Sequence, residues 1–101
     1  WCFVGHSHIQ CLFTQHPETE RVAVEQTVPD VTIALQPKLI INPGSVGQPR
    51  DRDPRAAYAI YDTEARTWTP KRVMYNIAEV QERIRAAGLP EKHAARIAEG
   101  W

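Results

Sequence analysis

The chain has 101 residues, enough for one small domain or a part of one. Its 12 lysines and arginines balance its 12 aspartates and glutamates, so no long-range field gathers polyanions, and nucleic-acid binding would need a local basic patch. No apolar run approaches the roughly 20 residues of a membrane span. The two cysteines are too few for a disulfide framework, which predicts free thiols and a cytoplasmic protein.

The first part of the chain is predicted to be rich in strands. Apolar or β-branched runs predict strands at residues 2–4, 11–14, 21–25, 31–35 and 38–41, the first of them buried. Residues 42–49 read Asn-Pro-Gly-Ser-Val-Gly-Gln-Pro, a composition that predicts a loop and neither strand nor helix. Residues 57–61 and 67–74 then predict a hairpin, with Pro70 at an edge or a bulge.

Two helices are predicted after this strand-rich part. Asn76 is a suitable N-cap with a glutamate three residues on, and apolar residues follow at spacings of three and four up to Gly88. Pro90 opens the second helix. The fold class is therefore α+β, with mostly antiparallel strands in residues 1–75 and a helical tail in residues 76–101.

The sequence Gly5-His6-Ser7-His8 directly follows the first predicted strand. In an extended segment the rings of His6 and His8 would point the same way, and Gly5 would let the backbone turn them toward a common point. Neutral imidazole is a good ligand for Zn, Mn, Fe and Ni. Two histidines do not complete a metal site, because even a catalytic zinc takes at least three protein ligands.

Other interpretations of these residues stay open from the sequence. His6 and His8 are also compatible with an exposed polar loop, and Cys2, His6, His8 and Cys11 together have the elements of a tetrahedral zinc site. Buried thiols are nevertheless the commoner fate of cysteines in apolar strands. The backbone amides of residues 42–49 could hold an anion or simply join two strands.

Two motifs taken together resemble a known family. Val4-Gly5-His6-Ser7-His8 is followed some thirty residues on by Ile40-Ile41-Asn42-Pro43-Gly44-Ser45-Val46-Gly47-Gln48-Pro49-Arg50. This combination resembles the C-terminal portion of calcineurin-like metallophosphoesterases, and most closely their compact prokaryotic branch. The resemblance runs from about residue 3 to residue 61, and the tail after residue 76 is similar to that of some longer members.

The resemblance implies a four-layer αββα fold around two divalent transition metal ions, Mn, Fe, Zn or Ni. It implies hydrolysis of phosphomonoesters or phosphodiesters by a water that bridges the metals. His6 would bind the second metal and His8 the first, while the loop at residues 42–49 would shape the rim of the site. Arg50 is a candidate contact to phosphate.

The family's other metal ligands, in its Asp-x-His, Gly-Asp-x-x-Asp and Gly-Asn-His motifs, lie upstream of Gly-His-x-His and are not in this sequence. The expectation is therefore a C-terminal half that is inactive without an N-terminal half of the same domain as its partner. A phosphoester would be the substrate, and a homo-oligomer is possible. The alternative is a non-catalytic binding module that retains a remnant of the fold.

Overall fold

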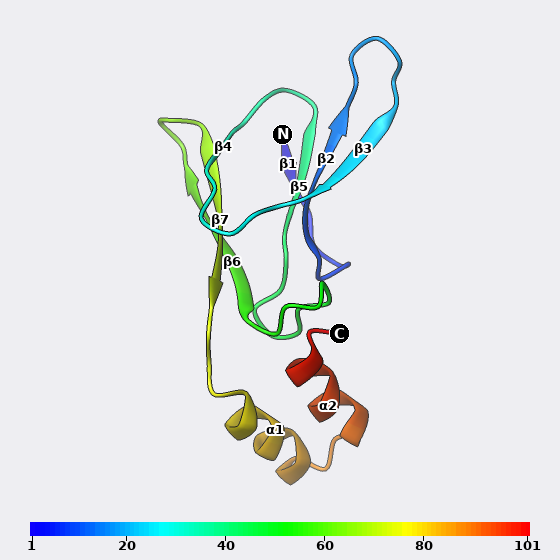
Figure 1. The fold of residues 1–101 in the computed structure, drawn as a ribbon, viewed down its shortest axis with the longest axis vertical. Coiled ribbons are helices and arrows are strands. Elements are labelled where there is room, and N and C mark those ends of the chain that lie inside the picture. The colour runs from blue at the N-terminus through cyan, green and yellow to red at the C-terminus, as the bar shows by residue number, and fades with distance from the viewer.

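The computed structural model describes residues 1–101 and contains two β-sheets and two helices (Figure 1). The first sheet has the order β1-β5-β2-β3 and the second the order β4-β7-β6. Only the β1–β5 pair is parallel. The bounds are β1 Cys2–Phe3, β2 Gln10–Gln15, β3 Val22–Gln26, β4 Ile33–Ala34, β5 Leu39–Pro43, β6 Ala56–Asp62, β7 Thr67–Val73, α1 Ile77–Ala86 and α2 Glu91–Glu99. The α+β prediction is confirmed.

The two sheets share a small core built by strand alternation. Leu12 of β2 lies opposite Ile41 of β5, so the two side chains point to the same face of the first sheet. They form a buried cluster with Trp68 of β7, which is 1% exposed. Because this cluster draws on both sheets, it fixes β5, and the loop that follows β5, relative to the rest of the chain.

Two predictions about the strands were wrong. The strand predicted at residues 2–4 is short and exposed, with Phe3 42% exposed, because β1 pairs with β5 on one side and has no neighbour on the other. Residues 42 and 43 belong to β5 and not to a loop. Asn42 pairs with Cys11, and Pro43 fits because it stands opposite Gln10 at the very end of the ladder.

The hairpin of β6 and β7 forms as predicted, with full pairing from Asp62↔Thr67 to Ala56↔Val73. Pro70 lies in the central strand of its sheet, but β4 pairs only with residues 67 and 68. Beyond the residues that pair with β4, the Pro70 carbonyl accepts a hydrogen bond from the Asp30 amide (2.8 Å). At Pro70, β7 therefore has a neighbouring strand on one side only, although β7 is the central strand of the sheet.

Both helices are confirmed. Asn76 caps α1, its side chain accepting a hydrogen bond from the Glu79 amide (3.1 Å), and Gly88 adopts a left-handed conformation after the last turn. The helices pack against each other at one end of the molecule and cover neither sheet (Figure 1). Neither helix has the length and apolar character needed to cross a membrane.

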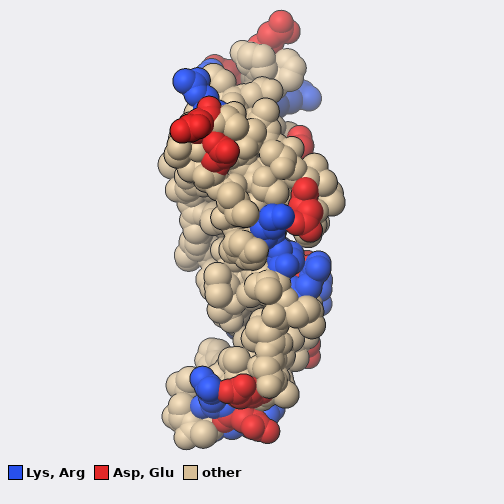
Figure 2. Space-filling model, turned by 90° about the vertical axis from the view of Figure 1, so that its left-hand side faces the viewer, with Lys and Arg blue, Asp and Glu red and all other residues tan.

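The chain is elongated for its size. Its radius of gyration is 15.7 Å, whereas a compact domain of this length has about 12.7 Å. Its accessible surface is 6752 Å², compared with about 5,800 Å² for a compact monomer of this mass. Seen from the side of β4, β6 and β7, charged side chains gather toward the two ends and in a middle band, with uncharged surface between them (Figure 2).

Candidate metal centre

The segment that carries the two histidines is a tight bend and not an extended strand. His6 and His8 both have left-handed backbones, with φ of +77° and +62°. Such a conformation costs a non-glycine residue about 1 kcal/mol. Gly5 lies outside this region, so the left-handed residues of the bend are His6 and His8, and strand alternation does not orient the rings. Strained backbones of this kind persist only where surrounding contacts impose them.

Asn42 imposes the bend from the end of β5. Its side chain is fully buried, and its Nδ2 donates to the Gly5 carbonyl (3.1 Å) and to Ser7 Oγ (2.8 Å). Its Oδ1 accepts a hydrogen bond from the Gly44 amide (3.0 Å). One asparagine thus ties the histidine bend to the loop that follows β5, because β1 and β5 are neighbours in the sheet.

His8 is held by the same loop. Its Nδ1 lies 2.8 Å from the Gln48 carbonyl, which can only accept, so Nδ1 carries the proton. The Arg50 amide in turn donates to the His8 carbonyl (3.1 Å). A neutral imidazole protonated at Nδ1 keeps the lone pair of Nε2 for a metal, and a carbonyl in this place is the usual support of a metal-binding histidine. His6 is exposed at the surface.

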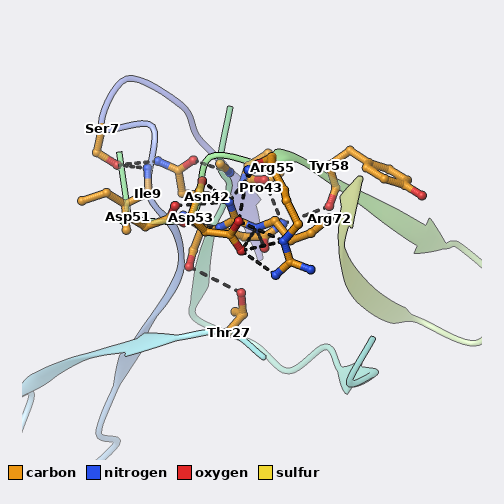
Figure 3. A network of polar contacts seen from close by, with 12 residues as sticks. Ser7, Ile9, Thr27, Asn42, Pro43, Asp51, Asp53, Arg55, Tyr58 and Arg72 are labelled. Atoms are coloured by element: carbon orange, nitrogen blue, oxygen red, sulfur yellow. Dashed lines mark hydrogen bonds and ion pairs between the residues drawn. The ribbon is translucent and has the colours of Figure 1, made fainter. Parts of the chain in front are cut away.

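The far end of this loop is anchored by a buried ion pair between Arg72 of β7 and Asp51 (Figure 3). Their side chains are only 5% and 7% exposed. The Arg72 guanidinium also donates to Gln10 Oε1 (3.2 Å) and to the Arg55 carbonyl (3.3 Å). Beside it, the hydrogen bonds from Arg55 hold the pKa of the Asp53 carboxyl below its usual range. Residues 42–55 are therefore fixed at both ends.

Gly44 is the one glycine of this loop that the packing requires. Its φ is +84°, and an added Cβ would lie 2.7 Å from the Ala57 Cβ. Gly44→Ala is expected to lower the free energy of unfolding by about 2 kcal/mol or more, from backbone strain and overpacking. Gly47→Ala is the matched control, because Gly47 has no positive φ and no atom within 4 Å of a Cβ. Urea unfolding of both variants measures the difference, and equal midpoints would contradict the prediction.

Two known proteins are similar to this chain in sequence or structure. No family model matches the chain. It is 38% identical over 95 residues to the uncharacterized protein MJ0912 of Methanocaldococcus jannaschii, a match over 94% of this chain and 37% of that protein. It superposes on the crystal structure of a metallophosphoesterase from Sphaerobacter thermophilus with a TM-score of 0.91 and 42% identity, over 99% of this chain. This chain resembles part of a metallophosphoesterase. It spans 41% of the Sphaerobacter chain, so it corresponds to less than half of either relative.

The side chains of this chain do not form a complete metal site by themselves. No group of three or more histidine, cysteine, aspartate or glutamate residues is placed to hold a metal ion. His6 and His8 fit as two nitrogen ligands of a larger set, since one has a supported tautomer and both lie in a bend fixed by other residues. The four-residue zinc site is not assembled, because Cys11 is 3% exposed in β2 and burial raises the pKa of its thiol.

Sequence reasoning missed three residues that matter for the candidate site. Gln48 supports His8 through its backbone carbonyl, so its side chain gave no signal. Arg72 lies 21 positions from Asp51, in the second sheet, whereas His8 lies between β1 and β2 of the first sheet, and no local pattern links these residues. Asn42 was seen only as a member of a glycine- and proline-rich run. Its amide type at the end of an apolar strand was the one available hint.

Proposed function

We propose that this chain contributes His6 and His8 to a two-metal phosphoesterase centre that hydrolyses phosphomonoesters or phosphodiesters. The observation that carries the proposal is the hydrogen bond from His8 Nδ1 to the Gln48 carbonyl, which leaves Nε2 free for a metal. Divalent metals, among Mn, Fe, Zn and Ni, would supply Lewis acidity toward phosphoryl oxygens and a nucleophilic water at neutral pH. The chain's own part is to hold two ligands in a fixed, strained bend.

The remaining ligands are proposed to come from a partner polypeptide segment, the N-terminal half of the same domain. The outer face of the first sheet supports this, and we define it as Phe13, Val22, Val24 and Ile40, which point away from the core by register. Val22, Val24 and Ile40 are 64%, 60% and 45% exposed. An uncovered apolar face of this kind marks an interaction site, and a layer of helices would complete the αββα arrangement.

This partner would also explain the elongated shape and large surface of the chain alone. Both cysteines are free, which is consistent with a protein of the cytoplasm. A contact between copies of this chain through the same outer face would give a homo-oligomer. It would not supply the Asp-x-His, Gly-Asp-x-x-Asp and Gly-Asn-His motifs, because this sequence does not contain them.

A chimera tests the proposed function. This chain replaces the matching segment of the Sphaerobacter metallophosphoesterase, to which it is 42% identical with a TM-score of 0.91. The chimera is expected to hydrolyse bis(p-nitrophenyl) phosphate when loaded with Mn²⁺. A folded chimera that binds two metals per chain and has no activity would refute the proposal. The 101-residue chain alone is expected to show no metal-dependent hydrolysis above its His6→Ala, His8→Ala variant, and clear activity would overturn the two-part site.

A further inference from the structure

A small cavity lies between the histidine bend and the C-terminal helix. Its volume is about 330 Å³, and it is lined by Ser7, Ile9, Arg50, Arg96 and Trp101. Ser7 separates the two histidines, and the Arg50 amide donates to the His8 carbonyl (3.1 Å). The cavity therefore adjoins the bend, although Arg96 and Trp101 come from the other end of the chain. Figure 1 shows the C-terminus beside the lower end of the sheets.

The helical tail is fixed in this place by its own contacts. The Gly100 carbonyl accepts a hydrogen bond from the Arg52 amide (2.9 Å), and the Arg52 guanidinium lies 3.9 Å from the centre of the Trp101 ring. Gly100 has a φ of +65°, and an added Cβ would lie 2.7 Å from the Asp53 amide nitrogen. Such close backbone packing and the cation–π contact hold one wall of the cavity against the loop that supports His8.

The cavity also has unneutralised positive charge. Arg55, Arg72, Arg83 and Arg85 all form ion pairs with carboxylates, but Arg50 and Arg96 form none. The Arg50 guanidinium donates only to Gln48 Oε1 (3.2 Å), and Arg96 is half-buried in the last turn of α2. Ile9 is half-buried, whereas Trp101 is 49% exposed and Arg50 is exposed, so both guanidinium groups can be reached by an anion from solvent.

We propose that this cavity binds a second phosphoryl group of the substrate, next to the one that is hydrolysed. The inference rests on the proposed function for the role of the neighbouring histidines, and it narrows the substrate class to phosphoesters that carry a further phosphate. Arg50 and Arg96 would donate to its oxygens, since a guanidinium matches phosphate geometry with two parallel donors. The helical tail is then a specificity element and not only a cap on the fold.

Titration of the 101-residue chain with inorganic pyrophosphate, without metal, tests the cavity by itself. The Trp101 indole signal in ¹H–¹⁵N spectra is expected to shift on binding. Arg96→Gln and Arg50→Gln are each expected to weaken binding about tenfold. Arg83→Gln is the matched control, since Arg83 lies on α1 outside the cavity, and it should bind as the unaltered chain does. The hydrogen bond from the Trp101 amide to the Arg96 carbonyl belongs to the backbone and survives the substitution.

The His6→Ala, His8→Ala variant separates this inference from the proposed function. It is expected to bind pyrophosphate unchanged, because the cavity does not use the imidazoles. Absence of a Trp101 shift, equal binding by Arg96→Gln, or loss of binding in the double histidine variant would each overturn the inference. An inactive chimera with intact pyrophosphate binding would refute only the dimetal role, and an active chimera without such binding would refute only the phosphate pocket.

Discussion

His8→Ala is expected to reduce kcat of the metal-loaded chimera about a hundredfold or more. Replacing residues that merely support a metal ligand already costs up to about a hundredfold, and His8 is proposed to be a ligand itself. The substitution also removes the hydrogen bond to the Gln48 carbonyl, so the loop loses one of its ties to the bend. The measurement is steady-state hydrolysis of bis(p-nitrophenyl) phosphate, together with the metal content per chain.

His16→Ala is the matched control for this prediction. His16 is exposed in the turn between β2 and β3, where its Nδ1 accepts only from the Glu18 and Thr19 amides. It is expected to keep full activity and full metal content. If His8→Ala retained both as well, His8 would not be a ligand. Its hydrogen bond to the Gln48 carbonyl would then serve only to hold the loop.

Arg72→Ala is expected to destabilise the chain by about 3–5 kcal/mol. The substitution leaves the carboxylate of Asp51 buried without its positive partner, and an uncompensated buried charge is among the costliest defects in a protein. It also leaves Gln10 Oε1 and the Arg55 carbonyl without their donor. A domain of this length has about 5–15 kcal/mol of stability in total, so the loss should be plain in urea unfolding.

Lys71→Ala, one position earlier on β7, is the control. Lys71 pairs with Asp30, whose side chain is 73% exposed, and exposed pairs contribute about 0–1 kcal/mol. Replacing both partners, as Arg72→Met with Asp51→Leu, should recover much of the lost stability, because no buried charge remains. Equal midpoints for Arg72→Ala and Lys71→Ala would show that the buried pair does not anchor residues 42–55.

Local signals in the sequence were sufficient for most elements. The capping pair of Asn76 and Glu79 and the glycine at position 88 set the bounds of α1 because caps act within one turn. The hairpin of β6 and β7 follows from two apolar runs joined by a short polar turn. The first strand was predicted to be buried because its residues are apolar, and apolar side chains are favourable to bury. What covers the segment depends on neighbours that the run does not specify.

The candidate site divides in the same way. The residue types of His6 and His8, and the loop from Asn42 onward, were by themselves sufficient to indicate the family and the two metal ligands proposed here. Only the tertiary structure decided how they are held: the left-handed bend, the Asn42 tie, the Gln48 carbonyl and the Arg72 anchor. Those contacts join residues about 20 to 60 positions apart, and several use backbone groups that every residue shares, so sequence patterns carry no record of the pairings.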